Sequence, residues 1–139
     1  MHKMRDRIPA ELKLANDFIM NSNCTDFMLD AFDGSTLRIV GSMDLSYYHE
    51  MEILFGEVDS LKTKISFMVD NQKPAFFLDG TEEEGARIAI LDDEGNRHRI
   101  VCEFIETRIG TVRYFDDEGK RYPTGKPLWT FPEHMQSEN

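Results

Sequence analysis

Two histidines lie close in the sequence to carboxylates and could take part in chemistry. His49 precedes Glu50 and Glu52, and His98 follows the acidic run 92–94. Such groups bind a metal ion when several donors converge, and move a proton when one carboxyl is desolvated. The spacing is not the H-E-x-x-H of a helical zinc site. We therefore expect structural histidines; the alternative is a metal-dependent enzyme or a ligand-binding cavity near His49 and His98, and no catalytic residue, metal ligand or cofactor is assigned.

A second candidate site is acidic. The run Asp-Asp-Glu-Gly occurs twice, 24 residues apart. In each copy the first Asp suits the start of a type I turn, and Gly95 or Gly119 suits the left-handed position that closes a three-residue hairpin loop. If both turns emerge at one end of a shared sheet, they form an acidic rim of Asp92, Asp93, Glu94, Asp116, Asp117 and Glu118. Solvated turn residues are the plainer interpretation, and a docking rim is the functional one.

An aromatic surface is the alternative binding site. Tyr47, Tyr48 and His49 are three ring side chains in a row, which could border a pocket or lie where the sheet meets the helix, and we favour the second setting. Trp129 and Phe131 form an apolar patch in a proline-rich segment. Exposed aromatic clusters are uncommon unless they bind something, so we expect this patch to pack on the sheet or to contact a partner.

One amphipathic helix and several hairpins must position these groups. Apolar residues recur at helical spacing after Pro9, which predicts a helix from Ile8 to about 21–23. Asp33-Gly34 predicts a hairpin turn between segments 27–32 and 36–40. Segment 45–55 alternates, which predicts a strand with His49 and Met51 on an apolar face and Glu50 and Glu52 in solvent.

The acidic repeat predicts the register of the next hairpin. A three-residue loop after Asp92 opposes Ile90 to His98 and Ile88 to Ile100. One face then carries Ile88, Ile90, Ile100, Cys102 and Phe104. A connection near 106–107 is expected to send strand 109–115 back up in the same sheet, so that hairpins 86–105 and 109–122 lie side by side.

These elements predict one α+β domain over residues 1–139. About seven mainly antiparallel strands are expected to form a curled or barrel-like sheet, or to fold over as a sandwich, with one N-terminal helix. Residues 1–7 are expected to be a loose arm, and 123–139 a proline-rich C-terminal tail without a long regular element.

Charge restricts the choice of partner. Lys and Arg total 16 against 26 Asp and Glu, a formal net charge of −10. This balance disfavours nucleic acid and anionic membranes, and it favours a basic protein or a metal ion as the partner. The sequence shows no signal peptide, no apolar stretch of transmembrane length, no phosphate loop, no nucleophile elbow and no EF-hand. We expect a small acidic cytoplasmic binding protein without catalysis, such as an inhibitor or immunity-type protein; its oligomeric state stays open.

Overall fold

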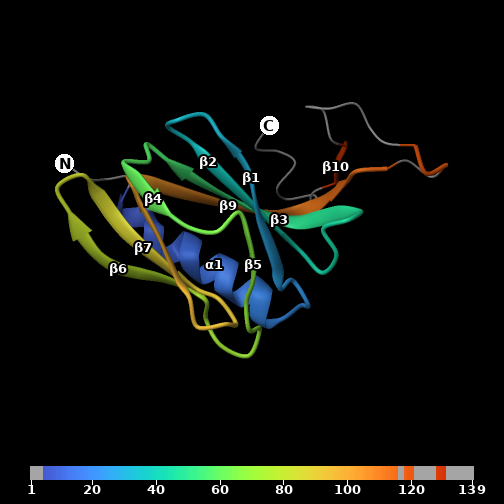
Figure 1. The fold of residues 1–139 in the computed structure, drawn as a ribbon, viewed down its shortest axis with the longest axis horizontal. Coiled ribbons are helices and arrows are strands. Elements are labelled where there is room, and N and C mark those ends of the chain that lie inside the picture. Colours follow the sequence, from blue (N-terminus) through green and yellow to red (C-terminus); the bar gives the residue numbers. More distant parts are fainter. Residues whose placement is uncertain (1–4, 116–117, 121–127, 131–139) are drawn as a thin grey trace.

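Two antiparallel sheets and one α-helix make up the fold in the computed structural model, which describes residues 5–115, 118–120 and 128–130 (Figure 1). The strand order is β10-β9-β3-β2-β1-β5 in the six-stranded sheet and β4-β8-β7-β6 in the four-stranded sheet. The expected α+β class is confirmed, with two sheets, neither closed into a barrel, in place of one curled sheet. The elements are η1 (Arg5–Arg7), α1 (Ile8–Met20), β1 (Asp26–Phe32), β2 (Leu37–Ser42), β3 (Tyr48–Gly56), β4 (Ser60–Lys62), β5 (Ser66–Met68), β6 (Phe76–Glu82), β7 (Gly85–Leu91), β8 (Arg97–Cys102), β9 (Phe104–Arg113) and β10 (Leu128–Thr130).

Helix α1 packs against strands of both sheets. Pro9 lies in its first turn, where a missing N–H costs nothing, and the helix ends at Met20 as its apolar spacing predicts. Its buried side chains contact β9 of the large sheet and β6 of the small one. The Asn16 side chain accepts hydrogen bonds from the Ala75 and Phe76 amides, both at 3.0 Å, and so fixes the start of β6 on the helix.

The hydrophobic core lies between the two sheets. Phe27 on β1 stacks on Phe67 with ring centroids 5.7 Å apart, and its ring meets Phe76 of the other sheet edge-on at 5.6 Å. Both cysteines are free and buried, as expected for Cys102. Burial raises the pKa of the Cys102 thiol to about 12, so the thiol is protonated at neutral pH.

The first hairpin has a longer loop than its Asp33-Gly34 dipeptide indicates. Phe32 pairs with Leu37, which leaves four residues in the loop. The Asp33 carboxylate accepts hydrogen bonds from the amides of Ser35 and Thr36. The register shifts around Asp30, and its carboxylate forms an ion pair with Arg38 at 2.6 Å. An extra residue in the strand thus keeps the acidic side chain out of the apolar face.

The β7–β8 hairpin has the predicted register. Ile90 pairs with His98 and Ile88 with Ile100. The Asp92 amide donates to the Asn96 carbonyl at 3.0 Å, and Gly95 has a φ of +86°, the left-handed value that the three-residue loop requires.

The prediction that this hairpin shares a sheet with segment 109–122 is wrong. Only Glu103 separates β8 in the small sheet from β9 in the large one, so the chain bends from one sheet to the other without turning back. The Glu103 amide donates to the Gly56 carbonyl at 2.9 Å at this bend. Phe104, expected in the core beside Cys102, is consequently only partly buried. A shared acidic rim requires that the strand after β8 return in the same sheet. That strand is β9, which belongs to the six-stranded sheet.

The N-terminal segment is also better ordered than predicted. Arg5–Arg7 form a 3₁₀ turn that leads directly into α1, and the Arg5 guanidinium binds the Glu103 carboxylate. A loose arm is therefore wrong for residues 5–7, and residues 1–4 lie outside the described part of the chain.

The C-terminal tail contributes a short edge strand. Within its described residues, β10 pairs with β9, with Trp129 opposite Val112. The remaining tail residues lie outside the description. Among the described residues, no helix has both the length and the apolar character needed to cross a membrane.

Candidate functional site

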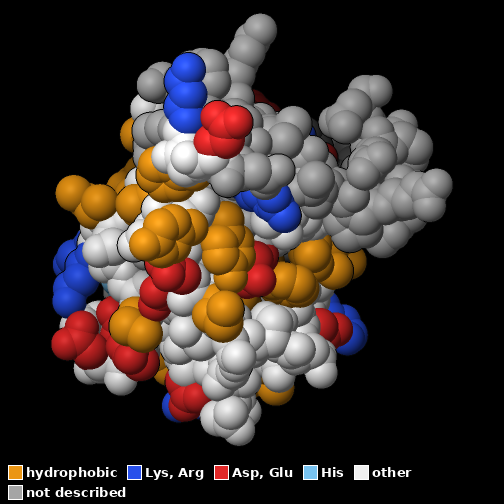
Figure 2. All heavy atoms as spheres, turned by 90° about the vertical axis from the view of Figure 1, so that its right-hand side faces the viewer, with side chains coloured by type: hydrophobic (Ala, Val, Ile, Leu, Met, Phe, Trp, Pro, Cys, Tyr) orange, Lys and Arg blue, Asp and Glu red, His pale blue; other side chains and the backbone are white. Residues whose placement is uncertain are grey.

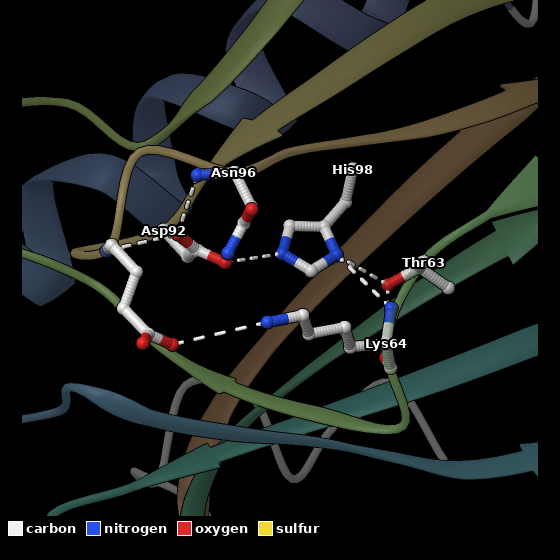
Figure 3. Close-up of polar contacts among 6 residues, drawn as sticks. Thr63, Lys64, Asp92, Asn96 and His98 are labelled. Carbon is white, nitrogen blue, oxygen red and sulfur yellow. Dashed lines mark hydrogen bonds and ion pairs between the residues drawn. The ribbon is translucent and has the colours of Figure 1, made fainter.

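The most complete polar network surrounds His98 (Figure 3). Its Nε2 lies 2.8 Å from Asp92 Oδ2, and both side chains are almost fully buried. Its Nδ1 lies 2.9 Å from the Thr63 hydroxyl and accepts from the Lys64 amide at 3.2 Å. The other Asp92 oxygen accepts from the amides of Glu94 and Asn96. The network thus joins the β7–β8 turn to the segment between β4 and β5.

The series Asp92, His98, Thr63 resembles a nucleophile activated by a base, but the Thr63 proton has another acceptor. The Thr63 hydroxyl donates to the Lys64 carbonyl at 3.0 Å, and the Lys64 amide donates to His98 Nδ1, which leaves a proton on Nε2 facing Asp92. Burial by itself raises the pKa of Asp92, but the hydrogen bonds from His98, Asn96 and Glu94 outweigh burial and hold it at about 2. Because every polar atom has a partner, this geometry is structural.

His49 takes part in a second buried pair, which sequence alternation did not predict. Its Nε2 lies 2.9 Å from Glu52 Oε2, and its Nδ1 lies 2.7 Å from the Tyr114 hydroxyl. Glu52 was expected in solvent, but its side chain is 1% exposed. The pairing with β9 shifts register between His49 and Met51, which interrupts the alternation and brings His49 and Glu52 together. Glu52 Oε1 has no hydrogen-bond partner in the described structure.

Glu50 lies between His49 and Glu52 on β3. Its charge helps to raise the pKa of Cys24, a core thiol, after burial, and it also acts on the Tyr48 hydroxyl. Burial raises the pKa of Tyr48 first, and the charges of Glu50 and Asp44 raise it further, while a hydrogen bond with Ser42 opposes them. One buried oxygen of Glu50, Oε2, has no hydrogen-bond partner in the described structure.

A hollow opens beside Tyr48. It has a volume of about 390 Å³ and is lined by Tyr47, Tyr48, Thr111, Arg113 and Phe115. The Tyr47 and Phe115 rings lie 6.1 Å apart and are tilted by 59°. Of the two expected settings for the tyrosines, the structure shows the pocket border, because no α1 residue lines the hollow.

Carboxylates continue from this hollow towards the β7–β8 turn. Asp26 pairs with Ser42 on β2 and with Met68 on β5. The Asp44 amide donates to the Ser42 hydroxyl at 2.9 Å and the Asp93 amide donates to the Met68 carbonyl at 2.8 Å, so both residues are bonded directly to the strand partners of Asp26. Burial raises the pKa of Asp26, and the charges of Asp44 and Asp93 raise it further. None of the three, nor Glu50, forms an ion pair within the described residues, whereas acids elsewhere pair with Arg5, Arg38, Arg87 and Arg108. We call the set of Asp26, Asp44, Tyr47, Tyr48, Glu50 and Asp93 the acidic–aromatic face.

Figure 2 looks onto the end of the molecule where β3 begins. Hydrophobic side chains gather there in an irregular patch, and carboxylates lie between them (Figure 2). Met43 and Tyr47, in the connection between β2 and β3, are 52% and 62% exposed.

Only some residues of the predicted acidic rim are both described and exposed. Asp92 is buried in the His98 network, while Asp93, Glu94 and Glu118 are exposed. Asp116, Asp117 and Phe131 lie outside the described residues, and Trp129 is described only as part of β10. The structure instead brings Asp44 and Asp93 onto the two strand partners of Asp26, and the sequence analysis singled out neither Asp26 nor Asp44. Asp26 and Asp44 would have been indicated if the pairing of Asp26 with Ser42 had been predicted from the sequence.

Comparisons with protein-family models, with curated proteins and with solved structures find no match to this chain. Among the described residues, no three His, Cys, Asp or Glu side chains are grouped so that they could hold a metal ion.

Proposed function

We propose that this protein binds a basic protein partner through its acidic–aromatic face, without catalysis. The observation that carries the proposal is that Asp44 and Asp93 are bonded to the two strand partners of Asp26, while none of these three carboxylates forms an ion pair within the described residues. Like charges held close together raise the free energy of the unbound face, and a cationic partner relieves this cost.

The aromatic residues of the face add apolar contact area, which the carboxylates do not provide. Tyr47 and Met43, in the connection between β2 and β3, are largely exposed. Tyrosine gives a large, rigid contact area and is enriched among the residues that dominate binding energy. Carboxylates around such residues speed the association of a basic partner. An acidic inhibitor or immunity-type protein needs this combination.

The setting that fits the proposal is a reducing one. Cys24 and Cys102 are both free, and neither side chain is exposed to solvent. Unpaired thiols are usual in the cytoplasm, so this observation supports a cytoplasmic protein.

The test is a pair of variants with the same change in charge. Asp44→Lys with Asp93→Lys reverses two charges on the face, and Glu83→Lys with Glu84→Lys reverses two exposed charges at the β6–β7 turn. After capture of a basic partner from native extract at low salt, association is measured by surface plasmon resonance. We expect the first variant to associate at least about tenfold more slowly and the second to stay within about twofold of the wild type. Equal rates in the two variants would show that the face does not dock the partner.

A further inference from the structure

The outer face of the four-stranded sheet carries cations, although the chain as a whole is acidic. Ile88, Ile90 and Ile100 belong to the core, so the residues that alternate with them on β7 and β8 face away from it. Cross-strand pairing places four of the outward residues in one row: Lys62 on β4, Arg99 on β8, Ala89 on β7 and Phe77 on β6. We call these four residues the basic row.

The two cations of the basic row have no carboxylate of their own. Lys62 and Arg99 are exposed and lie directly opposite each other on neighbouring strands. Within the described residues neither forms an ion pair, whereas Arg87 and Arg97 on the same face both pair with Asp79. Like charges directly opposite each other destabilise a sheet. A carboxylate placed against both side chains would offset this repulsion.

Phe77 gives the basic row an apolar end. Its side chain is 39% exposed, and Ala89, which separates it from Arg99, is 1% exposed. The row thus combines two cations with an exposed aromatic ring. Its complement is a surface that carries carboxylates beside exposed apolar side chains.

The acidic–aromatic face of the same chain has this complementary composition. Phe27 faces the core, so Asp26 lies on the outer face of the six-stranded sheet. Asp44 and Asp93 are bonded to the partners of Asp26 on β2 and β5, so the carboxylates span at least two strand spacings, about 10 Å. The basic row crosses four strands and spans about 15 Å. The two surfaces therefore match in width as well as in charge.

From these observations we infer that the basic row docks a second copy of this chain through that copy's acidic–aromatic face. Lys62 and Arg99 meet the carboxylates, and Phe77 meets the exposed Tyr47 and Met43. Because the two surfaces lie on the outer faces of different sheets, each docked copy keeps one of them open and the contact repeats in one direction. Charges farther apart than the Debye length, about 8 Å at physiological salt, are largely screened, so the net charge of −10 opposes these local contacts only weakly.

Self-association uses the same face as the proposed function but does not depend on it. A basic partner that occupies the acidic–aromatic face would displace the second copy, so the two contacts exclude each other. Assembly of the chain would then be reversed by the partner, and each contact can be measured without the other.

The experiment is sedimentation velocity on the full chain at physiological salt, from about 10 µM to about 1 mM protein. We expect the weight-average sedimentation coefficient to rise with concentration without a plateau at the dimer, and the rise to shrink at about 1 M salt. A wild-type chain that stays monomeric throughout would overturn the inference. So would a monomer whose Lys62 and Arg99 bind a poly-glutamate peptide or a single-stranded oligonucleotide instead.

Two charge-reversed variants test which surfaces meet. Lys62→Glu with Arg99→Glu reverses the basic row, and Asp44→Lys with Asp93→Lys reverses the opposing face. We expect each folded variant alone to associate at least about tenfold more weakly than the wild type, because like charges then meet. An equimolar mixture should associate again, because reversed row meets reversed face and intact row meets intact face. Failure of the mixture, with wild-type urea midpoints in both variants, would overturn the inference.

The matched control is Arg7→Glu with Lys13→Glu. It changes the net charge as much as the basic-row variant does, at two exposed positions of the N-terminal helical segment. We expect its association to stay within about twofold of the wild type. Equal weakening in the control would assign the effect to net charge and would overturn the inference.

The two proposals fail in different ways. If the wild type stays monomeric but the Asp44→Lys, Asp93→Lys variant docks a basic partner slowly, self-association is wrong and the docking face stands. If the chain assembles through these residues and partner docking ignores them, the proposed function is wrong.

Discussion

Arg5 and Glu103, 98 positions apart in the sequence, form a two-pronged ion pair at the bend between the two sheets. Arg5 Nε donates to Oε1 at 2.7 Å and Nη2 donates to Oε2 at 2.8 Å. The same guanidinium donates to the carbonyls of Glu82 and Glu83. One side chain thus joins the start of the helix, the bend after β8 and the β6–β7 turn.

Replacing Arg5 by Lys should therefore destabilise the fold although the charge is kept. A lysine ammonium cannot make the parallel pair of hydrogen bonds or reach the two carbonyls at the same time. We expect a lower midpoint in urea unfolding, and a similar loss for Glu103→Gln. Lys13→Gln, which breaks the exposed pair with Asp17, is the control and should change stability by less than about 0.5 kcal/mol. An unchanged midpoint in Arg5→Lys would show that the clamp contributes nothing to stability.

Asp92 should make the fold sensitive to acid. Its pKa is about 2 in the fold against an ordinary 3.8, so it stabilises the fold above pH 4 and this contribution disappears as the pH falls towards 2. The difference corresponds to about 2 kcal/mol. Urea unfolding from pH 5 to pH 2 should show this loss, and Asp92→Asn should flatten it while lowering stability at neutral pH by about 1–3 kcal/mol. The same slope in the variant would assign the acid sensitivity to other carboxyls.

His98 should be a single tautomer. The Lys64 amide donates to Nδ1, which leaves the proton on Nε2, facing Asp92. Long-range ¹H–¹⁵N NMR spectra of the imidazole at neutral pH should show the Nε2–H form for His98. A Nδ1–H form would mean that Thr63 accepts from the ring and that the Lys64 amide does not donate to it, and the tautomer assigned here would be wrong.

Asp26 should report the acidic crowding directly. Its raised pKa means that the fold holds this proton more tightly than the unfolded chain does, so Asp26 makes the fold less stable as the pH rises through that pKa. Asp44→Asn and Asp93→Asn should each lower the pKa of Asp26 in a carboxyl ¹³C titration, because each removes a nearby like charge. Glu83→Gln, at the β6–β7 turn, should leave it unchanged. No response to either face variant would separate Asp26 from the acidic–aromatic face.

A side chain added at Gly85 should lower the free energy of unfolding more than one added at Gly95. At Gly95, φ is +86° and an added Cβ meets nothing within 4 Å, so Gly95→Val carries backbone strain alone, about 1–2 kcal/mol. At Gly85, φ is +153° and an added Cβ would lie 2.6 Å from the Cys102 carbonyl oxygen. Gly85→Ala should therefore cost roughly 2–4 kcal/mol, despite its smaller side chain. Equal urea midpoints for the two variants would contradict this difference.

Local turn chemistry made part of the fold predictable. Asp92 and Gly95 determine the loop, and the loop determines every pairing of β7 with β8. The helix was equally predictable, because its apolar spacing and Pro9 are local signals. The bend at Glu103 was not predictable from local signals, because Arg5, which binds Glu103, lies far from it in the sequence.

The candidate site was less predictable than the fold. Strict alternation placed Glu52 in solvent, and the register shift before Met51 placed it against His49 instead. Asp26 and Asp44 come together only through the pairing of β1 with β2, at ends of strands that composition does not distinguish. Tyr47 and Tyr48 were singled out by type and do border a hollow, but its other wall includes β9 residues, and β9 was predicted to share a sheet with the β7–β8 hairpin.

The bend at Glu103 also bears on the order in which the chain folds. Strands β1, β2 and β3 pair with their sequence neighbours, and so do β6, β7 and β8, so each meander closes only short loops. The pairing of β3 with β9 joins residues from the two halves of the chain. Closing that long loop costs more conformational entropy, so the seam between β3 and β9 should form after the two meanders and limit the folding rate. During slow synthesis on the ribosome, the two meanders would thus form before β9 pairs with β3 and joins them.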